Sequence, residues 1–162
     1  MSNEDSNQVL YKILIERLEQ LRTMDKEGDS DRRRHIARET NELHAPLAHR
    51  LGLYAIKTEM EDLALKFLDY KTYKYIAHAL NEKKAQRDAY IHSFITPLEA
   101  KLKAAGFEFT IKGRPKSIHS IYHKMQVQRC DVDRIYDLFA IRIILDSPYE
   151  REKSDCWQVY SI

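Results

Sequence analysis

The stretch GRPKSIHSIYHKM, Gly113–Met125, is the most informative segment of this chain for its fold. It contains Arg114, Lys116 and Lys124 but no carboxylate, and the first acidic residue after it is Asp131. The whole chain of 162 residues has a net charge of only +2, so this local excess of positive charge departs from the mixture elsewhere. Arginine and lysine clustered in this way can bind a polyphosphate; the alternative is a solvated basic surface.

The residues around this stretch predict a strand, a turn and a helix. The alternation FEFTI over 107–111 is typical of a half-buried strand, which Gly113 closes. Pro115 restricts the loop that follows, and Ser117 is suited to cap the next helix. Apolar residues then recur at helical spacing and predict a packed face. They are Ile118, Ile121, Tyr122 and Met125.

A second face of this helix has the chemistry of a phosphate site. Lys116, Ser120 and Lys124 are spaced four apart, which predicts one row along the helix. A strand, a glycine turn and a helix start with such a row suit a nucleotide phosphate chain, although no Walker sequence is present. We expect His119 and His123 to lie on the outer side of the helix.

Upstream, apolar periodicity predicts a series of helices. The first, over residues 8–24, has an inward face of Leu10, Ile13, Leu14, Leu18 and Leu21. Ser30 or Asp31 can cap the next helix, which we expect to run to about residue 43. Pro46 begins a short helix that Gly52 ends. Further helices are expected over residues 56–68 and about 81–105, with a kink at Pro97 and a stop at Gly106.

Downstream, only one more strand is convincing, Phe139–Leu145, and a last helix is expected to begin near Ser154. Two strands make a marginal sheet, and their exposed edges would invite further pairing. We therefore expect the chain to be a fragment, in which the last sixty residues are the front half of a domain.

Composition favours an intracellular globular protein. Charged residues make up 32% of the chain and hydrophobic residues 43%. Cys130 and Cys156 form no CxxC pair, which argues against a disulfide framework and a cysteine zinc site. No apolar run has the length of a membrane span, and the polar start MSNEDSN is unlike a signal peptide. We expect a cytoplasmic protein that does not contact a membrane.

Three blocks of the chain, in order, resemble the RelA/SpoT family of bacterial (p)ppGpp synthetases and hydrolases. VLYKILIERLEQLRTM (Val9–Met24) resembles the last metal-binding helix of the hydrolase domain. ETNELHAPLAHRLGLYAIKTEMEDLALKFLD (Glu39–Asp69) resembles the link between the two domains. GRPKSIHSIYHKM with IYDLFAIRIILD (Ile135–Asp146) resembles the opening of the synthetase domain.

The resemblance implies a mainly α fold that continues as α+β. Residues 1–51 would be the end of a degenerate HD-type hydrolase domain, and residues 52–105 linking helices. Residues 106–162 would be the incomplete N-terminal part of a nucleotidyltransferase-like synthetase domain, with its first two strands. His44 and His49 fall in the linking block, and we expect them to be packing or interdomain residues.

In this family, ATP donates its β,γ-pyrophosphoryl group to the ribose 3′-hydroxyl of GDP or GTP, in the stringent response. The resemblance assigns Arg114 and, less directly, Arg142 to the adenine of ATP. It assigns Lys116, Ser120 and Lys124 to the ATP phosphates, and Asp137 to Mg²⁺. The family's catalytic glutamate and acceptor-binding tyrosine lie downstream of this chain. We therefore expect no catalytic residue within it and no transfer by it alone.

The hydrolase motif is altered. Where the family has DRLHN with a Mn²⁺-binding aspartate, this chain has Glu16-Arg17-Leu18-Glu19-Gln20. The longer Glu16 displaces the carboxylate, and Glu19 and Gln20 change the hydrogen-bonding groups. The other metal ligands lie upstream of residue 1. We expect that the Mn²⁺ site of the hydrolase is lost.

Two other classes of function remain open. One is a regulatory helical connector without chemistry, which would gain no thermal stability from ATP with Mg²⁺, unlike a donor pocket. The other is a helical RNA-binding module that uses Arg32-Arg33-Arg34 and the basic region 112–129, against which the balance of 27 basic and 25 acidic residues argues. A ribosome or RNA contact is also conceivable through regions outside this chain, and the oligomeric state is open.

Overall fold

The computed structural model describes residues 3–26, 28–82, 84–135 and 138–162, with their side chains except those of residues 3–6, 85–87 and 114–115. The chain divides into two compact units. The helical unit comprises Met1–His78 and Ser117–Arg134, and the sheet unit comprises Ala79–Lys116 and Ile135–Ile162. The expected fold class is confirmed, because helices dominate and a two-stranded sheet forms in the C-terminal part. The expected domains 1–51, 52–105 and 106–162 stay a prediction.

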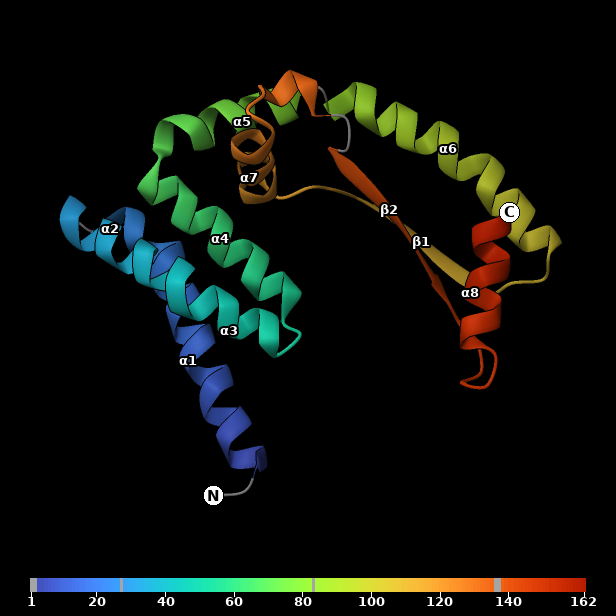
Figure 1. Ribbon diagram of the computed structural model, residues 1–162, viewed down its shortest axis with the longest axis horizontal. Coiled ribbons are helices and arrows are strands. Elements are labelled where there is room, and N and C mark those ends of the chain that lie inside the picture. The colour runs from blue at the N-terminus through green and yellow to red at the C-terminus, as the bar shows by residue number, and fades with distance from the viewer. Residues whose placement is uncertain (1–2, 27, 83, 136–137) are drawn as a thin grey trace. The chain divides into compact units, whose positions relative to one another are not determined.

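The helical unit is built around α4 (Tyr54–Leu68), which packs against four other helices (Figure 1). These are α1 (Asn3–Thr23), α2 (Ser30–Glu39), α3 (Ala45–Arg50) and α7 (Ile118–Gln128). Short helical turns at Met24–Lys26, Thr40–His44 and Val132–Arg134 complete the unit, together with most of α5 (Tyr70–Glu82).

The core of the helical unit is formed by the inner face of α1. Leu14, Leu18 and Leu21 are buried there against Met60 of α4 and residues of α2 and α3. Burying side chains of this size is worth roughly 1.5–3 kcal/mol each. The prediction for Ile13 was wrong: this residue remains 41% exposed, whereas its neighbour Leu14 is fully buried.

The connection from α1 to α3 begins at a cap one residue earlier than expected. Asp29, and not Ser30 or Asp31, caps α2, since its carboxylate accepts the backbone N–H groups of Asp31 at 2.9 Å and Arg32 at 3.1 Å. After Glu39 the helix widens into a π-helical turn, Thr40–His44, and continues directly as α3 with Pro46 in its first turn. Pro46 lacks the N–H that would continue the hydrogen-bond ladder, and the wider π-helical turn lies directly before it.

Glycine ends two of the helices as the sequence predicts. Gly52 has φ +74°, and the next N–H, that of Leu53, returns to the carbonyl of Ala48 at 2.9 Å. This left-handed closure satisfies carbonyls at the end of α3. The sequence patterns did not predict α5. The carboxylate of Asp69 caps this helix by accepting the backbone N–H of Thr72 at 3.0 Å.

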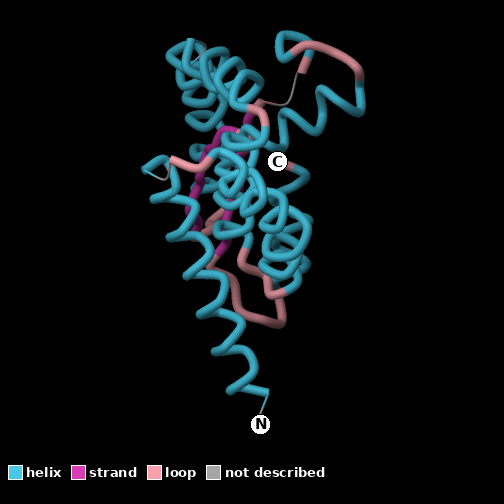
Figure 2. The backbone as a smooth tube through the Cα atoms, turned by 90° about the vertical axis from the view of Figure 1, so that its left-hand side faces the viewer, coloured by secondary structure: helices cyan, strands magenta, loops and turns pink. Residues whose placement is uncertain are grey.

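The sheet unit contains α6 (Lys84–Ala104), β1 (Phe109–Pro115), β2 (Phe139–Leu145) and α8 (Glu152–Ser161). The strands, magenta in Figure 2, pair antiparallel, with Phe109 opposite Leu145 and Pro115 opposite Phe139. The prediction for β2 is confirmed at both ends. Helix α6 continues through Pro97.

The first strand begins and ends later than expected. Phe107 is not in β1, because its backbone N–H closes α6 by donating to the carbonyl of Leu102 at 3.1 Å, beyond Gly106 at φ +80°. At the other end β1 runs through Gly113 to Pro115 instead of stopping at a loop, because pairing with β2 continues over these residues. A tertiary partner therefore decides the length of this strand.

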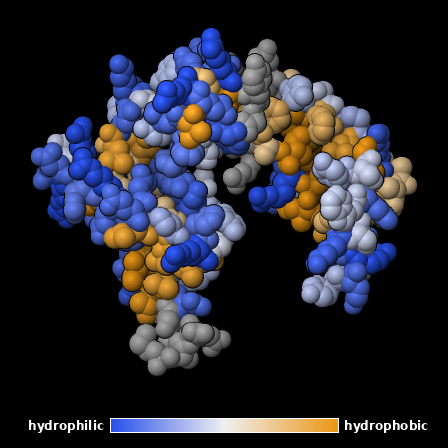
Figure 3. Space-filling view, viewed as in Figure 1, coloured by the Kyte–Doolittle hydropathy of each residue, from blue (hydrophilic) through white to orange (hydrophobic). Residues whose placement is uncertain are grey.

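One face of β2 lines an apolar groove of about 610 Å³ within the sheet unit, where Figure 3 shows hydrophobic surface in orange. Phe139, Ile141, Ile143 and Leu145 face it, with Phe94 among the residues of α6 that line it. The groove agrees with an incompletely covered sheet. No helix of the described residues is long and apolar enough to cross a membrane.

Candidate functional site

Helix α7 begins as the sequence predicts, with Ser117 as its cap. The Ser117 hydroxyl oxygen accepts the backbone N–H of Ser120 at 3.1 Å and donates to the Ser120 hydroxyl at 2.7 Å. The Ser120 hydroxyl proton is therefore still able to donate, while its oxygen is oriented by the cap.

Ser120 and Lys124 lie one turn apart on α7, and both are half-buried. Lys116 does not continue their row as expected, because it precedes the cap and lies outside the helix. Its backbone N–H donates to the carbonyl of Leu138 at 2.8 Å, which extends the pairing of β1 and β2 by one position. Lys116 thus belongs to the sheet unit, whereas Ser120 and Lys124 belong to the helical unit.

The N-terminus of α7 is occupied by a carboxylate from α4. The backbone N–H of His119 donates to Asp62 Oδ1 at 2.8 Å. Burial raises the pKa of Asp62, against the opposing effect of the backbone N–H groups of His119 and Ile118. The expectation that this helix start would receive a phosphate therefore needs correction, because its free N–H groups already have partners.

The prediction that His119 lies on the outer side of α7 was wrong. Its side chain is half-buried and packs against α4. Its Nδ1 lies 3.4 Å from Glu61 Oε2, and the Lys57 amine lies 2.8 Å from the same oxygen. Burial by itself raises the pKa of Glu61, but the hydrogen bonds with His119 and Lys57 bring it below its ordinary value. His123, in contrast, is exposed as expected.

Register in the sheet unit places Lys112 of β1 directly opposite Arg142 of β2. Both side chains are exposed, and among the described residues neither has a recorded ion pair. Like charges directly opposite one another destabilise a strand pair, so this pair favours a bound anion. The sequence indicates only that Lys112 is one of several basic residues. That it lies opposite Arg142 depends on the strand register, which the sequence does not reveal.

Arg114 lies in β1 opposite Ala140, and its side chain is outside the description. Asp137, the expected Mg²⁺ ligand, lies outside the described residues. Among the residues that are described, no group of three or more histidine, cysteine, aspartate or glutamate side chains has the arrangement of a metal site.

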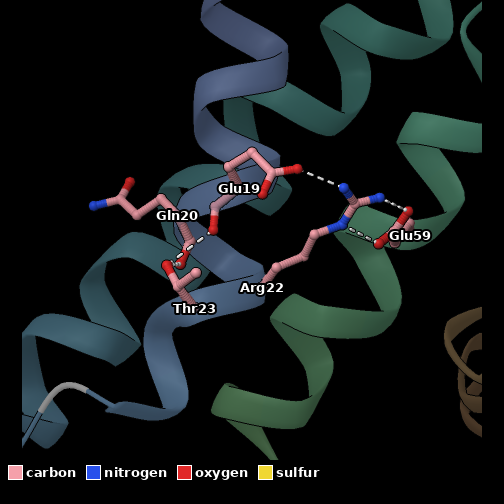
Figure 4. A network of polar contacts seen from close by, with 5 residues as sticks. All are labelled: Glu19, Gln20, Arg22, Thr23 and Glu59. Carbon is pink, nitrogen blue, oxygen red and sulfur yellow. Dashed lines mark hydrogen bonds and ion pairs between the residues drawn. The ribbon is translucent and has the colours of Figure 1, made fainter.

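The altered hydrolase positions lie on α1. Glu16 is exposed, with its Oε1 3.8 Å from the Lys12 amine. Glu19 accepts a 2.5 Å hydrogen bond from Arg22, whose guanidinium also binds Glu59 of α4 (Figure 4). These groups therefore form a polar network between two helices.

Gln20 and Thr23 complete this segment. The Thr23 hydroxyl donates to the backbone carbonyls of Glu19 at 3.0 Å and Gln20 at 3.3 Å (Figure 4). The Gln20 side chain points away from the Arg22 network in this view. The arrangement is that of a helix with ordinary surface contacts.

His44 is buried in the π-helical turn, as expected for a packing residue. Its Nδ1 lies 3.4 Å from the backbone carbonyl of Glu39, whose carboxylate binds Arg17 at 2.7 Å. Burial, aided by the charge of Arg17, lowers the pKa of His44. The ring is therefore favoured in its neutral form.

Comparison with known proteins relates both parts of the chain to one enzyme family. Residues 113–162 match the family model described as the region found in RelA/SpoT proteins, and residues 3–54 match the model of the HD domain. Together they are the two kinds of region that the sequence analysis expected, in the same order.

Several curated relatives are similar over most of this chain. A probable guanosine-3′,5′-bis(diphosphate) 3′-pyrophosphohydrolase of Synechocystis sp. is 37% identical over 95% of this chain and 20% of its own length. GTP pyrophosphokinases of Escherichia coli and Streptomyces coelicolor are 37% and 41% identical, over 92% and 86% of this chain and 19% and 16% of their own lengths.

The chain belongs to the RelA/SpoT family. It spans about a fifth of the length of the curated relatives it matches. The family uses nucleotides, and divalent metal ions are common in its RelA/SpoT and HD regions.

Proposed function

We propose that the protein containing this chain is a (p)ppGpp synthetase, which transfers pyrophosphate from ATP to the 3′-hydroxyl of GDP or GTP. The observation that carries this proposal is the match of residues 113–162 to the RelA/SpoT region, where the candidate ATP residues of the sequence lie. Two of the relatives are named GTP pyrophosphokinases, which agrees with it.

Charge in the sheet unit supports a polyanionic donor. Lys112 and Arg142 face one another across the strands without an ion pair recorded among the described residues, so a phosphate group would relieve their repulsion. We assign Arg142 and Arg114 to the adenine side of ATP, as the resemblance implies, and add Lys112 as a neighbouring cation.

Helix α7 itself supports a phosphate role. Ser120 and Lys124 present a hydroxyl and an amine on successive turns of α7, and we assign both to the ATP phosphates. We assign Lys116 the same role, as the resemblance implies. Since the N–H groups at the start of α7 are occupied, these side chains and not the helix end would bind the phosphates. Pyrophosphoryl transfer relies chiefly on such positioning and charge neutralisation.

The proposed metal of the synthetase is Mg²⁺, held by Asp137 of the sequence YDLFAIR. A carboxylate is the ligand type that this hard cation prefers, and the bound ion would neutralise charge on the transferred group. For the hydrolase region we propose that Mn²⁺ is no longer bound, because Glu19 and Arg22 are engaged with each other and with α4.

A thermal-shift titration of the chain with ATP and Mg²⁺ tests the donor site. We expect the melting temperature to rise with ATP, and to rise less in Lys124→Ala. An unchanged melting temperature at millimolar ATP would favour the alternative, a helical connector that binds no donor.

Activity is to be measured in the complete protein, since the catalytic glutamate and the acceptor site of the family are expected outside this chain. Formation of (p)ppGpp from ATP and GDP or GTP would support the proposal; its absence in an otherwise folded protein would overturn it. Cytoplasmic location and contact with the ribosome or RNA stay predictions.

A further inference from the structure

Helix α7 is fixed at its N-terminus by a residue that lies 57 positions earlier in the chain. Asp62 of α4 accepts the backbone N–H of His119, which is one of the donors that a helix start leaves unpaired. A capping carboxylate normally comes from the residue that precedes the helix. Here Ser117 fills that position, and Asp62 supplements it from another helix.

Two further contacts hold α7 against the helices of the same unit. At its start, Glu61 of α4 contacts His119, with the two atoms 3.4 Å apart. Beyond its end, the hydroxyl of Tyr75 on α5 donates to Asp131 Oδ1 at 2.6 Å. Both ends of the helix are thus tied to α4 and α5, so the position of α7 follows the helical unit.

The Asp62 carboxylate has two effects on the residues of α7. It fixes the first turn, and thereby the direction in which Ser120 and Lys124 project from the next turns. It also places negative charge where a helix would otherwise attract an anion, so phosphate is directed to the side chains and not to the helix end.

We infer that Asp62 is a positioning residue for ATP binding: it holds α7 so that Ser120 and Lys124 meet the phosphates, without itself contacting the nucleotide. This inference rests on the proposed function. Two experiments keep its failure distinguishable from the failure of that function.

The first experiment measures amide hydrogen exchange in the chain without nucleotide. In Asp62→Ala we expect the amide of His119 to exchange roughly tenfold faster, because its acceptor is lost. Asp69→Ala is the matched control, since Asp69 caps α5 through Thr72 and has no recorded contact with α7 among the described residues. Unchanged exchange at His119 in Asp62→Ala would overturn the inference, whatever the activity of the protein.

The second experiment measures the steady-state synthetase reaction of the complete protein. Asp62→Ala should raise KM for ATP roughly tenfold while KM for GDP stays unchanged, because only the donor residues on α7 are displaced. Asp69→Ala should change neither constant. If KM for ATP rose equally in Asp62→Ala and Asp69→Ala, the effect would be a general structural one, and the positioning role would be overturned.

A conservative variant and a double variant complete the test. Asp62→Asn keeps an acceptor oxygen and should keep KM for ATP near that of the parent protein. A rise in KM for ATP as large as in Asp62→Ala would overturn the hydrogen-bond role. Asp62→Ala with Lys124→Ala should be little worse than Lys124→Ala alone, because both remove the same contact. If the unaltered protein makes no (p)ppGpp, the proposed function fails, and the exchange result still decides whether Asp62 anchors α7.

Discussion

Arg22 on α1 donates two hydrogen bonds to Glu59 on α4, from Nε to Oε1 at 2.6 Å and from Nη2 to Oε2 at 2.8 Å. Glu19, at a position where the hydrolase motif of the family has histidine, binds the third guanidinium nitrogen. Hydrogen bonds to Glu59 and Glu19 raise the pKa of Arg22 and favour its charged form. A helix that resembles a catalytic segment is thus tied to α4 by a salt-bridge network.

Replacement of Arg22 tests this network. Because the pair is exposed, Arg22→Ala should lower the melting temperature by no more than a few degrees, and the effect should diminish with added salt. Arg22→Lys should also be less stable, since lysine cannot form the two-point contact. A double-mutant cycle with Glu59→Gln measures the coupling; strictly additive effects at low salt would contradict the geometry.

Truncating side chains on two neighbouring faces of α1 should reduce the unfolding free energy by very different amounts. Leu21→Ala removes a fully buried side chain and should cost about 2–5 kcal/mol of unfolding free energy. Ile13→Ala, at a site 41% exposed, should cost markedly less. Urea denaturation followed by circular dichroism measures both. Similar losses would mean that Ile13 is buried after all, as its spacing in the sequence suggests.

Stability should decline in mild acid because of His44. Burial lowers the pKa of His44 in the folded chain below its ordinary 6.5, so the unfolded chain binds the proton first as the pH falls. The contribution of His44 is therefore complete above about pH 6.5 and is lost between that pH and the lower pKa of the folded state, with a slope of at most about 1.4 kcal/mol per pH unit. His44→Gln should reduce this slope in denaturation measured from pH 7.5 to 5. The same slope in both proteins would exclude His44 as its source.

The altered hydrolase motif predicts little (p)ppGpp hydrolysis by the complete protein with Mn²⁺. Glu16 is exposed on α1 and Glu19 binds Arg22, so neither is arranged with other ligands among the described residues. Release of pyrophosphate from (p)ppGpp is the measurement. Efficient hydrolysis would show that these substitutions are compatible with the metal site.

The donor assignment predicts different effects at two positions. Lys116→Ala in the complete protein should weaken ATP binding by about 1.5–3 kcal/mol, because a charge-assisted contact is removed. Asp137→Ala should abolish turnover while the fold persists, because the proposed Mg²⁺ site is lost. Calorimetric titration with ATP and an assay of (p)ppGpp formation separate the two effects. Normal turnover by Asp137→Ala would refute its assignment.

Much of the local structure was predictable because short-range rules decide it. Ser117 caps α7, Gly52 and Gly106 end their helices, and the alternation of Phe139–Leu145 marks β2. The family itself was predictable from three blocks in order. The site was only partly predictable: the roles of Lys116, Ser120 and Lys124 remain predictions, and their expected single helical row does not exist.

The sequence alone determined several helix ends, such as the cap at Ser117 and the stops at Gly52 and Gly106, because caps and glycines act within one or two turns. It did not determine which unit each element joins. Only the tertiary structure assigns α7 to the helical unit, since Asp62 and His119 meet across 57 positions of the chain, and only strand pairing sets Lys112 opposite Arg142. Such long-range contacts depend on how the faces of whole elements pack, and no local pattern encodes their partners.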